Sequence, residues 1–303
     1  MEIFAANQTK AFYCMITLHH YPNLRLNNPI SNIKKMINII NKKLNKYGFS
    51  IIRNVFEEKE INVINERIQK HIQSENVGII RELDKKAIRA IHGIHLSDTF
   101  FDKLSADPRI LKQAVSYLKK PCYIHQTKIN MKAKKIGERW PWHQDYIYWK
   151  KEDGLLKPNL LNVAILLSPV TMQNGPICLI PKSHKLGCMT NILNDKISGW
   201  NGNVSVELTY QIESDMATQL MENNPATHFV GMPGDVMFFD PMTIHGSEIN
   251  NSDMNRNIFL FTYNAIDNLP TVKKDNLRPD FLCSRKHFPL ETSDQFNILD
   301  WNK

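Results

Sequence analysis

The sequence has little cysteine: five residues in 303, none of them in a Cys-x-x-Cys pair. An odd, scattered set of cysteines excludes a disulfide framework and a cysteine-rich zinc site. The sequence also lacks an uncharged apolar run of the roughly 20 residues that a membrane-spanning helix needs. Its first ten residues, MEIFAANQTK, lack the basic start of a secretory signal, and the apolar stretch that follows is too short. We therefore expect a cytoplasmic protein in a reducing compartment, with no membrane partner.

Composition excludes a disordered chain, because hydrophobic residues make up 42% of the sequence and can build a core. The net charge of +8 is unevenly placed. Residues 1–151 carry 27 basic and 13 acidic side chains, whereas residues 152–303 carry 11 and 17. A basic half can indicate a nucleic-acid partner. Here the bases are mostly lysines spread along expected helix faces without interleaved aromatic residues, so we expect no nucleic-acid partner.

The chain divides into a helical part followed by a β-rich part. Residues 1–30 lack periodicity and are expected to form an N-terminal extension to a single domain at 31–303. Apolar spacing predicts helices near 33–47 and 61–72, and Asp107-Pro108 predicts the start of a third. A polar, irregular insert at 190–226 is expected to form either a lid or a mobile insert, with a lid favoured. Short β-like runs predict a sandwich or barrel at 49–56, 122–131, 140–145, 162–170, 176–181, 228–239 and 258–265.

Two histidines and one aspartate stand where a metal site is expected. His143 and Asp145 are two residues apart in a predicted strand, so their side chains are expected on one face. His245 follows the predicted strand at 234–240. Two imidazoles and one carboxylate form the facial triad of non-haem Fe(II) oxygenases. Arg256 opens the next predicted strand, where a buried guanidinium can bind a carboxylate through two hydrogen bonds.

These residues and their surroundings resemble the phytanoyl-CoA dioxygenase family of Fe(II)/2-oxoglutarate oxygenases. The likeness is strongest to the bacterial branch that hydroxylates free L-proline or ectoine, and it spans roughly residues 45–292. One departure is Lys182, at a turn where the family usually has glycine. The matching stretches are IRAIHGIHLS at 88–97, YIHQTKINMKA at 123–133, WPWHQDYIYWKKEDG at 140–154, NGPICLIPKSH at 174–184, residues 234–247, TYNAIDN at 262–268 and RPDFLCSR at 278–285.

The resemblance implies a mainly β fold with flanking helices, a double-stranded β-helix or cupin-like jelly-roll barrel. It also implies hydroxylation of an unactivated carbon by O2 and 2-oxoglutarate, with succinate and CO2 as coproducts and ascorbate as the expected reductant in vitro. Related halogenases have a small residue in place of Asp145, so its presence favours hydroxylation. The implied Fe(II) ligands are His143, Asp145 and His245, and the residues implied near 2-oxoglutarate are Arg256, Ser247, Asn130 and Gln126.

Aromatic residues cluster around the predicted iron ligands, which indicates a pocket for a small ring, and a zwitterion would also need a cationic partner. L-Proline, hydroxylated at carbon 4, is the leading substrate; ectoine and pipecolate are alternatives. A catalytically silent binding barrel and a nucleic-acid or protein hydroxylase are alternatives of other classes, and the oligomeric state stays open. His92 is expected to be structural. The candidate substrate-binding residues are Trp140, Trp149, Tyr146, Phe239, Arg89, His95 and Arg278.

Overall fold

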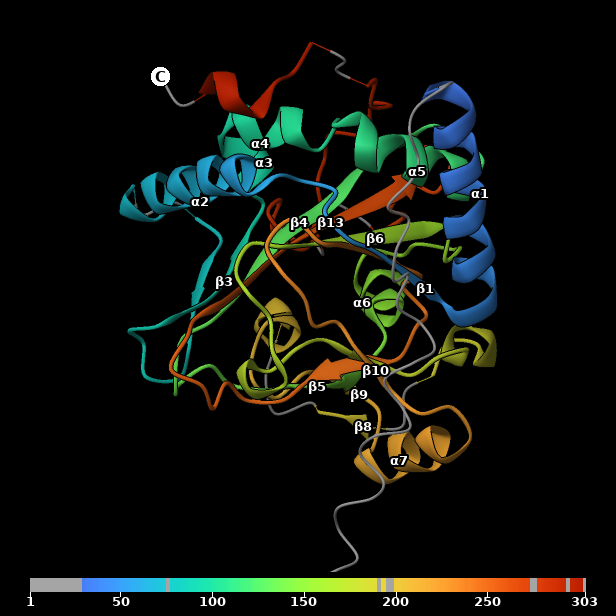
Figure 1. Cartoon of the computed structure of the whole chain (residues 1–303). Coiled ribbons are helices and arrows are strands. Elements are labelled where there is room, and N and C mark those ends of the chain that lie inside the picture. Colours follow the sequence, from blue (N-terminus) through green and yellow to red (C-terminus); the bar gives the residue numbers. More distant parts are fainter. Residues whose placement is uncertain are drawn as a thin grey trace, which may run out of the picture.

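The computed structural model describes residues 29–74, 77–189, 192–194, 199–272, 277–292 and 295–301, so the extension predicted at residues 1–30 lies almost wholly outside the described residues. A seven-stranded antiparallel sheet has the strand order β1-β11-β6-β13-β4-β3-β2, and a four-stranded sheet has the order β10-β7-β12-β5 (Figure 1). The strands are β1 Phe49–Ile52, β2 Ile79–Arg81, β3 Ile88–His92, β4 Cys122–Lys132, β5 Trp140–His143, β6 Leu160–Leu166, β7 Cys178–Leu179, β8 Ile192–Leu193, β9 Tyr210–Gln211, β10 Thr227–His228, β11 Val236–Phe239, β12 His245–Ser247 and β13 Arg256–Ala265.

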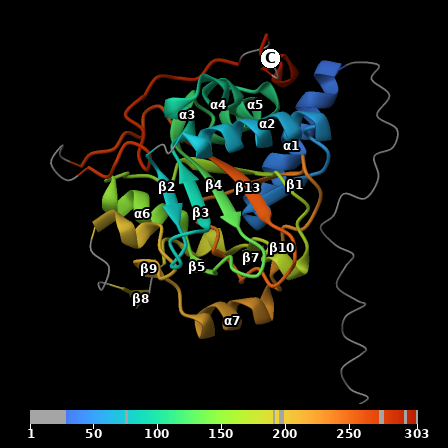
Figure 2. The same cartoon turned by 90° about the vertical axis from the view of Figure 1, so that its left-hand side faces the viewer.

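Helices flank the large sheet on one side. Figure 2 shows α2, α4 and α5 above the strands and α7 at the opposite end of the molecule. Among the described residues, no helix is long and apolar enough to cross a membrane. The helices are α1 Pro29–Tyr47, α2 Glu58–Gln73, α3 Ile94–Ser97, α4 Thr99–Leu104, α5 Pro108–Leu118, α6 Asp145–Glu152 and α7 Ser214–Asn223, with 3-10 turns η1 Met172–Asn174, η2 Ser183–Leu186, η3 Gly199–Asn203 and η5 Ile298–Trp301.

The central strands are hydrophobic on both faces because each face packs against another layer. In β13, Phe259 and Phe261 belong to the core cluster beneath the helices, whereas Ile258 and Leu260 belong to the cluster between the sheets. This period of two divides β11 in the same way. The two packed antiparallel sheets with flanking helices confirm the predicted mainly β architecture.

Local signals in the sequence place the ends of several elements. The Asp107 side chain accepts a hydrogen bond from the Arg109 amide at 2.9 Å and caps α5, as predicted. Gly48 ends α1 with φ of 89°, and a Cβ there would lie 2.5 Å from Thr243 Oγ1. The insert at 190–226 is less irregular than predicted, because its described part contains the β8–β9 pair, η3 and α7.

The backbone conformation at Lys182 explains why related sequences usually have glycine at this turn. Lys182 precedes η2 with φ of 66°, a left-handed conformation that glycine adopts without steric cost. Its backbone amide donates a hydrogen bond to Tyr47 O at 2.8 Å. The turn therefore keeps its contact with the end of α1 while the lysine backbone carries strain.

Candidate active site

Three metal-ligating side chains meet where β5 and β12 pair. His143 and His245 are opposite each other in the strand register, and their ring centroids are 4.3 Å apart. Asp145 Oδ1 lies 3.7 Å from His143 Nε2, and Asp145 Oδ2 lies 3.7 Å from His245 Nε2. All three side chains are buried, and one ligand atom from each lies within 4.8 Å of the others. This spacing suits a single ion held by two imidazoles and one carboxylate.

The prediction that His143 and Asp145 share one strand is wrong. Strand β5 ends at His143, and Asp145 is the first residue of α6. Gln144 fixes this change of direction: its buried amide donates to Met242 O at 2.6 Å and to Gly187 O at 2.9 Å. The carboxylate therefore reaches the histidine because a helix begins at Asp145, and not because the two residues alternate along one strand.

Backbone carbonyls set the tautomer of both histidines. His143 Nδ1 lies 2.7 Å from Pro141 O, and His245 Nδ1 lies 2.9 Å from Thr243 O. A carbonyl only accepts hydrogen bonds, so each Nδ1 carries the hydrogen and each Nε2 keeps its lone pair for a metal. Burial, aided by the neighbouring His143, lowers the pKa of His245 to about 3, which keeps this ring neutral.

Two neighbours hold the Asp145 carboxylate. Lys128 Nζ donates to Oδ1 at 3.2 Å, and Asn162 Nδ2 donates to Oδ2 at 2.8 Å. Burial alone would raise the pKa of Asp145, but the charge of Lys128 and the imidazole of His245 outweigh burial, so the pKa lies well below its ordinary value. Neutral imidazoles and an ionised carboxylate are the protonation states that a metal requires. The residues present therefore fit an iron ion.

Arg256 is buried in the barrel, and only part of its guanidinium is hydrogen-bonded by the described residues. Its Nη2 donates to Gly175 O at 2.7 Å, while Nε and Nη1 are buried without a hydrogen-bond partner among the described residues. Burial, with a contribution from Arg89, lowers the pKa of Arg256 to about 9, so the group is still a cation at neutral pH. A buried cation with free donors is costly unless an anion joins it.

Lys132 adds a second basic side chain that the sequence reasoning missed. It is the register partner of Arg256 across β4 and β13, and its Nζ donates to Ser247 O at 3.3 Å and to Glu248 O. Burial and the charge of Arg256 lower the pKa of Lys132 to about 5. A carboxylate bound between the two side chains would favour the charged lysine. The missed signal was the alternation along β4, where Gln126, Lys128, Asn130 and Lys132 are spaced two residues apart.

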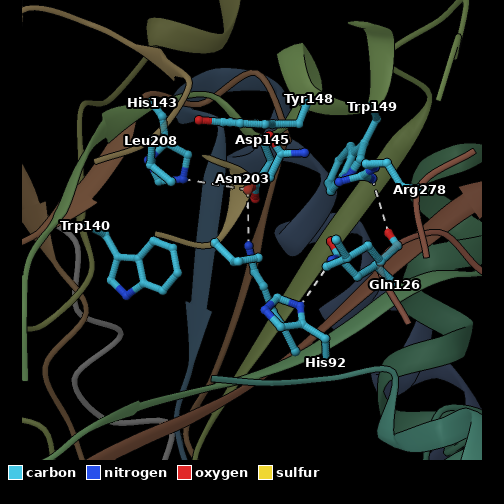
Figure 3. Close-up of a pocket in the computed structure, with 13 residues that line it drawn as sticks. His92, Gln126, Trp140, His143, Asp145, Tyr148, Trp149, Asn203, Leu208 and Arg278 are labelled. Carbon is cyan, nitrogen blue, oxygen red and sulfur yellow. Dashed lines mark hydrogen bonds and ion pairs between the residues drawn. The ribbon is translucent and has the colours of Figure 1, made fainter. Parts of the chain in front are cut away.

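A pocket opens beside the triad (Figure 3). Of the predicted substrate residues, it brings together Trp140, Trp149 and Arg278, and Gln126, predicted near 2-oxoglutarate, also lines it. His92, expected to be structural, also lines it, and its Nδ1 lies 3.3 Å from Gln126 Nε2. The full lining is His92, Gln126, Lys128, Trp140, His143, Asp145, Tyr148, Trp149, Asn203, Val204, Leu208, Arg278 and Leu282.

The other predicted substrate residues are not in this lining. Arg89 is engaged by Glu82, by three backbone carbonyls and by the ring of Trp140, 3.8 Å away. His95 Nδ1 pairs with the Thr127 hydroxyl, and the Tyr146 hydroxyl donates to Leu155 O. Phe239 belongs to the core cluster between the sheets, with its ring 5.2 Å from that of His245. Their geometry indicates support for the site.

Arg278 is held at the pocket by a buried carboxylate. Its Nε and Nη2 donate to the two oxygens of Asp153 at 2.8 and 2.6 Å, and His125 Nε2 lies 2.9 Å from Asp153 Oδ2. His125, Asp153 and Cys283 are also close enough together to suggest a second metal group. The guanidinium already neutralises the carboxylate, so we assign this cluster to holding Arg278.

The chain is similar to known proteins over most of its length. Residues 44–258 match the family model described as Phytanoyl-CoA dioxygenase (PhyH). An L-proline trans-4-hydroxylase of Streptomyces griseoviridis is 31% identical over 250 residues, 82% of this chain and 92% of the relative. An ectoine dioxygenase of Stutzerimonas stutzeri is 29% identical over 272 residues, 84% of this chain and 86% of the relative.

Solved structures share the fold. EctD from S. alaskensis with bound Fe has a TM-score of 0.69 at 24% identity and covers 84% of this chain and 85% of its own. EctD with 2-oxoglutarate and 5-hydroxyectoine has a TM-score of 0.68 at 24% identity, covering 81% and 82%. This likeness confirms the predicted cupin-like jelly roll.

Proposed function

The chain belongs to the phytanoyl-CoA dioxygenase family of 2-oxoglutarate-dependent hydroxylases, and from this premise we propose that it hydroxylates free L-proline at carbon 4. The observation that carries the proposal is one pocket lined by His143 and Asp145 of the triad, by two tryptophans and by an anchored arginine. The similarity to an L-proline trans-4-hydroxylase along most of both chains supports this choice of substrate.

We assign the iron to His143, Asp145 and His245. Iron bound there, with 2-oxoglutarate and O2, would supply an oxidant that hydroxylates an unactivated carbon, leaving succinate and CO2. The chain's part is to hold the ligands in fixed positions. The carbonyls of Pro141 and Thr243 orient the two imidazoles, while Lys128 and Asn162 keep the carboxylate ionised and in place.

We assign Arg256 to the distal carboxylate of 2-oxoglutarate. Its two free donors, Nε and Nη1, suit a carboxylate, and Lys132 supplies a second basic group across the strand pair, charged once a carboxylate is bound. Ser247 follows the ligand His245 on β12, in the four-stranded sheet, and its carbonyl accepts a hydrogen bond from Lys132 Nζ. Asn130 Oδ1 is buried without a partner among the described residues and faces the same barrel interior as Lys132 by strand alternation.

The substrate's carboxylate is assigned to Arg278. Asp153 holds two of its nitrogens, so the guanidinium is oriented before substrate arrives and its loss of freedom on binding is small. Trp140 and Trp149 supply aromatic walls suited to a small saturated ring that bears a cationic nitrogen. Closely packed walls also limit water around the reacting carbon.

Ectoine is the second candidate, because ectoine dioxygenases cover a similar share of this chain at similar identity. It is also a small cyclic zwitterion, so the same arginine and aromatic walls would accept it. Proline and ectoine differ in ring size and in the groups around the ring nitrogen, which a direct assay distinguishes.

The test is an aerobic incubation of the purified chain with Fe(II), ascorbate and 2-oxoglutarate. L-Proline, pipecolate, ectoine and no substrate are added in separate reactions. We expect succinate in a one-to-one ratio with singly oxygenated proline, identified by mass spectrometry. Succinate coupled to oxygenated ectoine instead would replace proline by the second candidate. No substrate-dependent succinate in an iron-loaded sample would favour the silent-barrel alternative.

A further inference from the structure

Asn203 presents a polar side chain with no partner to the pocket. It ends η3 in the insert and lines the pocket with His143, Asp145 and Arg278 (Figure 3). Both atoms of its amide, Oδ1 and Nδ2, are shielded from solvent and have no hydrogen-bond partner among the described residues. Buried amides are normally paired, so this one requires an explanation.

The backbone around Asn203 is fixed, so its side chain is held in place. Arg89 Nε donates to Val204 O at 3.1 Å, and Arg89 Nη2 donates to Ser205 O at 3.1 Å. On the other side, the Thr209 amide donates to Gly202 O at 2.9 Å. The buried guanidinium of Arg89 thus anchors this part of the insert to β3 and gives the unpaired amide a defined position.

We propose that Asn203 is a specificity residue whose amide oxygen accepts a hydrogen bond from the ring ammonium of the amino-acid substrate. This inference rests on the proposed function. An amide offers an acceptor oxygen and a donor nitrogen, which match the two polar groups at one end of a zwitterion. With Arg278 at the carboxylate, Asn203 would identify the nitrogen. A site that hydrogen-bonds an N–H rejects analogues without it, because its own polar group then stays unpaired.

The experiment compares L-proline with tetrahydrofuran-2-carboxylate, which has an oxygen in place of the ring N–H. Equilibrium binding is measured without O2, on the chain loaded with Fe(II) and 2-oxoglutarate. The variants are Asn203→Ala and the matched control Asn201→Ala, which changes an exposed asparagine of the same turn. For Asn203→Ala we expect the Kd for L-proline to rise about 10–100-fold, as for a charge-assisted hydrogen bond, and its preference over the analogue to fall by a similar factor.

The outcomes separate two failures. Binding of L-proline by Asn203→Ala as tight as wild type, or an unchanged preference over the analogue, would overturn the role of Asn203 while the proposed function stands. A wild-type chain that binds 2-oxoglutarate but neither proline nor another cyclic amino acid would overturn both. Unchanged stabilisation of each variant by 2-oxoglutarate excludes misfolding as the cause of weaker binding. Asn201→Ala is expected to match the wild type throughout.

Discussion

Replacing Arg256 by methionine should stabilise the ligand-free chain and abolish its response to 2-oxoglutarate. The side chain is fully buried and has one hydrogen bond, to Gly175 O, while two of its nitrogens have no hydrogen-bond partner among the described residues. Taking a charge out of water is costly, and replacing buried ionic groups by well-packed apolar side chains of similar volume is often neutral or stabilising by about 1–4 kcal/mol. We expect a gain of that order in the free energy of unfolding of Arg256→Met, measured by urea denaturation without iron or cosubstrate.

Ligand should reverse the order of stability. A ligand at 1,000 times its Kd stabilises the folded state by about 4.1 kcal/mol. The wild type should show this increase with 2-oxoglutarate in the presence of iron, whereas Arg256→Met should show little. The variant should therefore be the more stable protein without ligand and lose that advantage when ligand is added.

Arg89→Met is the matched control. Arg89 is as buried as Arg256, but it pairs with Glu82 and donates to three backbone carbonyls. Its removal leaves the buried carboxylate of Glu82 without its counter-ion and should cost about 3–5 kcal/mol. If Arg256→Met lost as much stability as Arg89→Met, Arg256 would be a structural residue. If it kept the full 2-oxoglutarate response, the cosubstrate would bind elsewhere.

Three further predictions concern single residues. Lys182→Gly should raise the free energy of unfolding by about 1 kcal/mol, because glycine adopts the left-handed conformation at this position without strain. The control Lys185→Gly, in the following turn, should give no such increase. Urea denaturation measures both variants. Asp153→Asn should lower the free energy of unfolding by about 3–5 kcal/mol, because it leaves Arg278 without its buried counter-ion. It should also raise the KM for the amino acid more than the KM for 2-oxoglutarate. An equal increase in both KM values would contradict the role of Asp153 in holding Arg278. Folding lowers the pKa of Lys132 from 10.5 to about 5, so unfolding takes up a proton between these values and the ligand-free chain should gain stability as pH rises through this range. Denaturation at pH about 6.5 and about 8.5 should show a shallower rise for Lys132→Met, and an equal slope would refute the assignment.

The sequence predicted those parts of the site that depend on residue type and order. His143, Asp145, His245 and Arg256 could be named because two imidazoles, a carboxylate and a following arginine are a sparse chemical pattern. The geometry that unites the first two was mispredicted. The run of aromatic residues predicts a continuous strand. In the structure, the Gln144 side chain donates a hydrogen bond to Met242 O, and a helix begins at Asp145.

Residues whose importance depends on tertiary contacts could not be predicted. Arg89 and Arg278 both lie in segments that match the family. Only the folded chain shows that the donors of Arg89 are already hydrogen-bonded to Glu82 and to the insert. Asn203 lies in a polar stretch with no periodicity. Its interest arises from having no partner once the insert is folded over the pocket.

The measurement that tests the central claim most directly is the iron content of the chain after anaerobic dialysis against Fe(II) and 2-oxoglutarate. The account predicts one iron per chain for the wild type and none above background for His143→Ala. Asp215→Ala, which changes an exposed aspartate of α7, should bind one iron as the wild type does. Full iron loading of a folded His143→Ala would contradict the assignment of His143, Asp145 and His245 as the metal centre.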